Sequence, residues 1–182
     1  MNDQKITIKY IIIGILVVLF TWVLHEFAHW LTYTSFGYDY MMTLNKVSYL
    51  KGNKPSNSHQ IIAGAAGPII TIIQALLAFL FLKFKNWKKN IYLFLFTAFY
   101  MRFLAGILNF INPNDEGAIS IHFGIGLYTI SIIVSGLLFY MVYKTSRKHK
   151  LKWKFQFWTT IIVMFVSSII ILSDQFIGIR II

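Results

Sequence analysis

The residues of this chain best suited to do chemistry are two histidines four positions apart in an apolar stretch. The motif His25-Glu26-Phe27-Ala28-His29 places both imidazoles on one face of a helix, one turn apart, where they can bind a single Zn²⁺. Glu26 lies beside them and can take a proton from metal-bound water. The competing interpretation is a polar cluster that only hydrogen-bonds neighbouring helices. We favour the zinc site because the chain also supplies the further ligand that such a site needs.

That further ligand must come from another part of the chain, because a catalytic zinc site has three protein ligands and one open position for water. The chain contains no cysteine, so histidine and carboxylate side chains are its strong ligands. One cluster fits, the Asn-rich turn at residues 108–117, where Asp115 or Glu116 can complete the site. In the same turn Asn109 could hold a substrate backbone or donate to an oxyanion, and it could equally cap a helix end.

The composition places these residues in a membrane protein. Hydrophobic residues make up 57% of the chain and charged residues 13%, which is typical of an integral membrane protein and not of a soluble domain. We predict an all-α fold in which residues 1–182 form a single polytopic membrane domain. Apolar stretches long enough to cross a bilayer of about 30 Å lie near residues 8–31, 61–82, 91–111, 119–143 and 156–173. The last stretch is short and could lie partly in the membrane interface.

The segment between the first two stretches, residues 32–60, is too polar to be a span. Residues 38–44 and 47–50 are typical of short strands, and residues 52–57 of a turn. We therefore expect a hairpin or a re-entrant element beside the site, where a strand edge could pair with an unwound substrate. A plain connecting loop is the alternative.

The net charge of +11 comes from short basic segments between the apolar stretches, a pattern typical of membrane topology determinants and not of a nucleic-acid-binding surface. The positive-inside rule places the N-terminus in the cytoplasm of a multi-pass protein of the cell membrane, with the site toward the outer face. Basic residues on the two sides number twelve against four: Lys5, Lys9, Lys83, Lys85, Lys88, Lys89, Lys144, Arg147, Lys148, Lys150, Lys152 and Lys154 against Lys46, Lys51, Lys54 and Arg180.

One basic residue, Arg102, falls in the middle of an apolar stretch. A buried charge must be paired, so we expect it to meet Asp174 or backbone carbonyls, or else to bind a substrate group.

Three short blocks occur in order along the first two thirds of the chain. They are the motif at residues 25–29 with Gly37 eight residues further on, the block Ala65-Ala66-Gly67-Pro68, and the turn that contains Pro113, Asp115 and Gly117. In this order the blocks resemble the motifs of the site-2 protease family of intramembrane zinc metalloproteases, over about residues 20–125. Two positions depart from the family pattern: Glu116 separates Asp115 from Gly117, and Thr71 stands where the family usually has an asparagine.

The resemblance implies a three-helix metalloprotease core in which His25, His29 and Asp115 bind Zn²⁺ and Glu26 is the catalytic base. Pro68 would then lie in the first turn of the second core helix. The implied activity is hydrolysis of peptide bonds in or near transmembrane segments, with membrane proteins or leftover signal-anchor peptides as substrates and the lipid bilayer as the surroundings. The alternative is a non-proteolytic metal-binding or partner-binding membrane scaffold, which would need the ligands but not Glu26.

Overall fold

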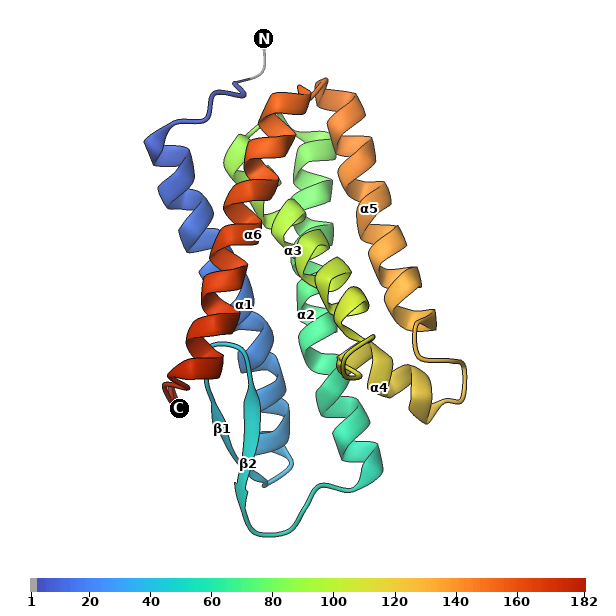
Figure 1. Ribbon diagram of the computed structural model, residues 1–182. Helices are drawn as coiled ribbons and strands as arrows, with labels where there is room; N and C mark the ends of the chain where they lie inside the picture. Colours follow the sequence, from blue (N-terminus) through green and yellow to red (C-terminus); the bar gives the residue numbers. More distant parts are fainter. Residues whose placement is uncertain (1–2) are drawn as a thin grey trace.

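The computed structural model describes residues 3–182, which form six helices and one two-stranded hairpin (Figure 1). Every helix except α4 is long and apolar enough to cross a membrane, so the described residues contain the five predicted helices of this kind. The elements in chain order are α1 (Ile8–Ser35), β1 (Asp39–Met42), β2 (Val47–Lys51), α2 (Asn57–Phe84), α3 (Lys89–Leu108), α4 (Asp115–His122), α5 (Thr129–His149) and α6 (Trp153–Phe176).

Hydroxyl side chains determine where α1 and α2 begin. Thr7 precedes α1 and its hydroxyl accepts a hydrogen bond from the backbone N–H of Tyr10, while Ser56 precedes α2 and accepts from that of His59. Such caps satisfy first-turn N–H groups that have no partner within the helix. Because Ser56 caps α2 this early, Pro68 lies inside the helix. The prediction that Pro68 lies in the first turn was wrong.

The fourth predicted span, residues 119–143, is divided into two helices. Gly124 and Gly126 have φ of +65° and +91°, a backbone conformation that glycine adopts readily and other residues rarely. These glycines follow α4 and separate it from α5, which begins only at Thr129. The continuous span was therefore wrong at its N-terminal end. In contrast, the final helix is longer than predicted, with 24 residues from Trp153 to Phe176.

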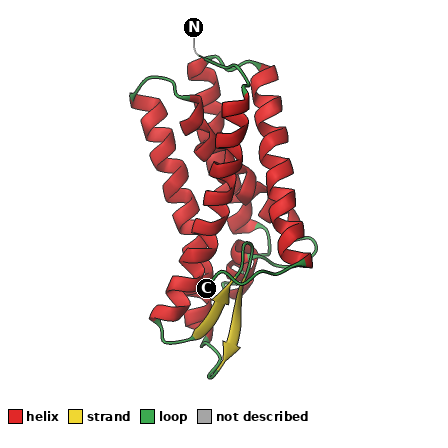
Figure 2. Ribbon diagram, turned by 90° about the vertical axis from the view of Figure 1, so that its left-hand side faces the viewer, coloured by secondary structure: helices red, strands yellow, loops and turns green. Residues whose placement is uncertain are grey.

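The predicted hairpin is present, and α6 holds it in place. Strands β1 and β2 pair in antiparallel fashion, and Asp174 of α6 accepts hydrogen bonds from the Thr43 hydroxyl and the Leu44 backbone N–H, both at 3.0 Å, in the turn between them. The other edge of β1 is also paired, because Met42 donates its backbone N–H to the carbonyl of Ile182 at 3.1 Å. Figure 2 shows the hairpin beside the lower end of the helices.

The helices pack into one bundle with an apolar interior and an apolar surface. Two hydrogen bonds join α1 to α6, between the hydroxyls of Tyr10 and Thr159 at 2.9 Å and from the Trp22 indole to Ser167 at 3.2 Å. Large apolar side chains are also exposed along the outside of every membrane-length helix. Such a surface suits contact with lipid.

The two ends of the bundle differ in charge. The N-terminus and the α2–α3 and α5–α6 connections lie at one end, whereas the hairpin, the α3–α4 turn and the C-terminus lie toward the other (Figure 1). These first three segments, together with the helix ends beside them, carry the twelve basic residues that form the larger group in the topology prediction. The fold therefore gathers at one end the charges that the topology prediction assigned to one side.

Candidate metal centre

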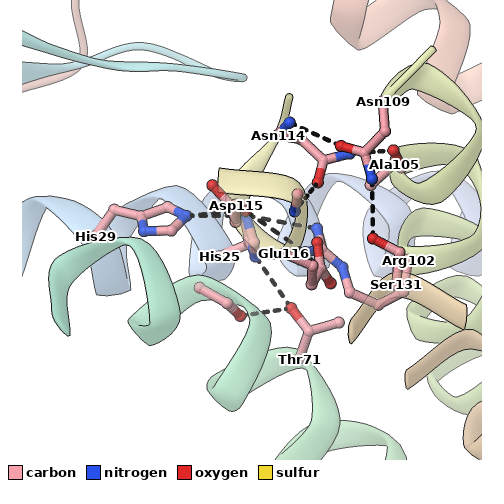
Figure 3. Close-up of polar contacts among 12 residues, drawn as sticks. His25, His29, Thr71, Arg102, Ala105, Asn109, Asn114, Asp115, Glu116 and Ser131 are labelled. Carbon is pink, nitrogen blue, oxygen red and sulfur yellow. Dashed lines mark hydrogen bonds and ion pairs between the residues drawn. The ribbon is translucent and has the colours of Figure 1, made fainter. Parts of the chain in front are cut away.

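Three ligand atoms from two distant parts of the chain, α1 and the first turn of α4, meet in the structure (Figure 3). His25 Nε2 lies 3.1 Å from Asp115 Oδ2 and 3.1 Å from His29 Nε2, and His29 Nε2 lies 3.4 Å from the same carboxylate oxygen. Three ligands that hold one tetrahedral zinc ion at about 2.1 Å are about 3.4 Å from one another. The observed separations therefore suit a single small cation, and the three residues could hold a metal ion.

Hydrogen bonds on the far side of each imidazole fix where its proton lies. His29 Nδ1 is 2.7 Å from the carbonyl oxygen of Ala63, which can only accept, so Nδ1 carries the proton. His25 Nδ1 is 3.2 Å from the Thr71 hydroxyl, which donates its own proton to the Gly67 carbonyl and therefore accepts from the imidazole. In both neutral imidazoles the Nε2 lone pair then faces Asp115. Three acceptors this close repel one another unless a cation lies among them. Imidazoles that donate from one ring nitrogen to the protein and direct the other at a cation are typical of metal-binding histidines.

The close approach of α2 to the imidazoles depends on Gly67. A Cβ atom at this position would lie 2.3 Å from His29 Nε2 and 2.4 Å from His25 Cε1, well inside van der Waals contact. A residue with any side chain would displace the imidazoles from Ala63 and Thr71. The Ala-Gly-Pro block of the sequence thus packs directly against the histidine pair.

Asp115 reaches the histidines because it lies in the first turn of α4, and Asn109 holds the turn before that helix. The Asn109 side chain accepts a hydrogen bond from the Asn114 backbone N–H at 2.9 Å and donates to Ser131 at 2.9 Å. Asn114 caps α4 and also donates to the Ala105 carbonyl. Asn109 is buried and does not contact the three ligand atoms (Figure 3). Its predicted oxyanion role stays a prediction, and the contacts favour a role in positioning Asp115.

Glu116, the other candidate ligand, points to a different partner. Its Oε1 accepts from Arg102 Nη1 at 3.0 Å, and the same nitrogen lies 3.5 Å from Asp115 Oδ2. The expectation that Arg102 is paired is confirmed, and its partner is Glu116. Among the alternatives considered, Asp174 was wrong, because Asp174 binds the hairpin turn instead. The Arg102–Glu116 pair is neutral, so Asp115 supplies the negative charge of the ligand group.

The ionisation of Asp115 follows from these neighbours. The guanidinium group of Arg102, whose Nη1 lies 3.5 Å from Asp115 Oδ2, favours the charged carboxylate over the neutral acid. The carboxylate is therefore available as an anionic ligand near neutral pH.

A cavity of about 790 Å³ opens onto the ligand group and brings Glu26 to it. Glu26, His25, His29 and Asp115 all line this cavity, so Glu26 borders the same space as the three ligand residues. Other parts of the wall come from α3, the α3–α4 turn, the end of α6 and the hairpin, through residues such as Leu104, Pro113, Gln175, Asn45 and Val47. The cavity wall is therefore formed by membrane-length helices on some sides and by the hairpin on another.

No known protein-family model, curated protein or solved structure matches this chain. The assignment of function therefore depends on the geometry of the site. Two groups at the site could not be assigned from the sequence. The Ala63 carbonyl belongs to the backbone and has no sequence signal. The charge of Arg102 within an apolar stretch indicated a buried pair, but it did not indicate that Arg102 lies beside the ligands.

Proposed function

We propose that this protein is an intramembrane zinc endopeptidase that hydrolyses peptide bonds in or near transmembrane segments. The observation that carries the proposal is the meeting of two imidazole lone pairs and one carboxylate oxygen at the wall of a cavity that Glu26 also lines. A site that only binds metal needs the ligands, but it does not need a buried carboxylate beside them. The position of Glu26 therefore favours hydrolysis over metal binding alone.

Each residue of the site has a separate role in the proposed hydrolysis. His25, His29 and Asp115 would hold the zinc ion, which when bound supplies a Lewis acid that acidifies water and polarises a carbonyl. Glu26 accepts the proton of the attacking water and then delivers it to the nitrogen of the leaving amine. Ala63 and Thr71 keep the imidazoles oriented through Nδ1.

The surroundings of the cavity favour a membrane-derived substrate. A transmembrane helix has its carbonyls hydrogen-bonded internally, so a substrate must unwind before cleavage. Strand β2 contributes Val47 to the cavity wall and can accept an extended segment alongside it, whereas the outer edge of β1 is paired with Ile182. We infer that the substrates are single-span membrane proteins or leftover signal-anchor peptides.

The substitution Glu26→Gln tests the proposal. The amide keeps nearly the same volume and leaves the three ligands in place, but it cannot accept a proton. We expect the purified variant to retain zinc while its cleavage of a model transmembrane peptide in liposomes falls at least about 100-fold. Turnover close to that of the wild type would remove Glu26 from the mechanism. A zinc-loaded wild type that cleaves none of a varied set of single-span substrates would favour the metal-binding scaffold instead.

A further inference from the structure

Arg102 lies against the ligand group with most of its hydrogen-bonding capacity unused. It is only 2% exposed and lines the cavity from α3. Its Nη1 donates to Glu116 Oε1 at 3.0 Å, but the nearest acceptor of Nη2 is His25 Nε2 at 3.5 Å, and Nε has no partner among the described residues. A guanidinium group has five N–H donors. Only one of them makes a hydrogen bond of ordinary length here.

Metal binding would remove the long contact between Arg102 Nη2 and His25 Nε2. His25 Nε2 has a single lone pair, and a metal ion bound there would occupy it. Nη2 would then be a buried, charged donor without an acceptor, which is unfavourable unless another acceptor enters the site. The cavity is the route by which such an acceptor can arrive, and a peptide carbonyl oxygen is the acceptor that a substrate brings.

We propose that Arg102 is a catalytic residue that donates from Nη2 to the oxygen of the scissile carbonyl and stabilises the negative charge that develops there. The inference rests on the proposed peptidase function. The oxygen of water bonds to the carbonyl carbon as one water proton passes to Glu26, and the π electron pair moves onto the carbonyl oxygen. When that pair returns, the C–N bond breaks and Glu26 gives its proton to the nitrogen, which leaves an acid and an amine.

Two observations assign this role to Arg102: its distance from the ligand atoms, and the fact that the other candidate donor is already hydrogen-bonded elsewhere. Its guanidinium nitrogens lie 3.5 Å from both His25 Nε2 and Asp115 Oδ2, so they reach the reacting bond itself. A terminal carboxylate of a peptide would lie at least one residue further along the chain, about 3.8 Å from the reacting position. The other candidate donor, Asn109, already uses its amide on Ser131 and is held by Asn114. Glu116 keeps Arg102 in place without being a member of the ligand group.

The test uses a phosphinic peptide, in which a charged tetrahedral phosphinate replaces the scissile amide. For the full-length Arg102→Gln variant we expect affinity for this peptide and kcat each to fall about 100-fold. KM should change by less than about threefold, and zinc content should equal that of the wild type. Arg102→Lys should recover part of the loss, because it restores the charge. Arg147→Gln removes an exposed arginine at the far end of the bundle and should leave phosphinate affinity unchanged.

A merely structural Arg102 would give a different pattern. Phosphinate affinity equal to that of the wild type, or a loss that simply follows loss of zinc, would overturn the proposal. If Arg102→Gln does not fold because Glu116 is left unpaired, the double variant Arg102→Gln/Glu116→Gln is compared with Glu116→Gln alone. Equal phosphinate affinity in those two variants would also overturn it. A wild type that binds zinc but neither cleaves nor binds the phosphinate would instead overturn the peptidase function.

Discussion

Each ligand of the candidate metal centre is oriented by a neighbour that lies behind it. His29 and His25 donate from Nδ1 to Ala63 and Thr71 of α2. Asp115 and Glu116 are adjacent in sequence, and the sequence could not separate their roles because that depends on the rotation of α4. Adjacent helical side chains point about 100° apart, and in the structure this turn directs Asp115 to the histidines and Glu116 to Arg102.

At this scale we predict that Gly67→Ala disrupts the centre without unfolding the bundle. The new Cβ would lie 2.3 Å from His29 Nε2, so the imidazoles must move away from Ala63 and Thr71. Loss of such orienting contacts weakens metal binding by about 10- to 100-fold. Competition with a chromogenic zinc chelator measures the affinity.

Gly64→Ala is the matched control, because it lies on the same helix and a Cβ there meets nothing within 4 Å. It should keep wild-type zinc affinity. Equal affinities for the two variants would show that α2 does not press on the imidazoles as described.

Among the secondary-structure elements, those with strong local signals could be predicted and those that depend on contacts between distant segments could not. Apolar length predicted the helices that are long and apolar enough to cross a membrane, and alternating residues beside turn formers predicted the hairpin. The early start of α2 depends on the Ser56 cap, and the division after α4 depends on Gly124 and Gly126. The attachment of the hairpin to Asp174 joins segments about 130 residues apart, which no local pattern reveals.

That attachment leads to a prediction at the element scale. Asp174→Asn replaces the charged acceptor of the Thr43 hydroxyl and the Leu44 N–H, and hydrogen bonds to a charged group contribute about 1.5–3 kcal/mol. We expect amide hydrogen exchange in residues 39–51 to become at least about tenfold faster while zinc is retained.

Asp3→Asn is the control for Asp174→Asn. Asp3 also accepts a backbone N–H and pairs with Lys89, but it lies at the other end of the bundle. Its substitution should leave exchange in the hairpin unchanged. If Asp174→Asn has equally little effect, α6 does not hold the hairpin.

For the whole molecule, the separation of charge between the two ends of the bundle predicts its orientation in the membrane. The N-terminus and the α2–α3 and α5–α6 connections share the basic end, which the positive-inside rule assigns to the cytoplasm. The hairpin and the α3–α4 turn then face outward, and the candidate metal centre lies toward that side. This orientation would direct cleavage to the outer part of a substrate's transmembrane segment.

Single cysteines test the orientation, because the chain contains none. Lys85→Cys, Arg147→Cys and Asn53→Cys are all at exposed positions. In sealed cells a membrane-impermeant maleimide should label only the variant at residue 53, and all three should be labelled after the membrane is opened. Labelling at residues 85 and 147 in sealed cells would reverse the topology.

The most direct test of the central claim is the amount of zinc per chain in the purified protein, measured by elemental analysis. The wild type should hold about one zinc ion, and His25→Ala, His29→Ala and Asp115→Ala should each lose it, because zinc needs all three ligands. Glu116→Ala should largely keep it, since Glu116 binds Arg102 and not the ligand group. Zinc that is retained in Asp115→Ala and lost in Glu116→Ala would contradict the account, as would a wild type that binds no zinc.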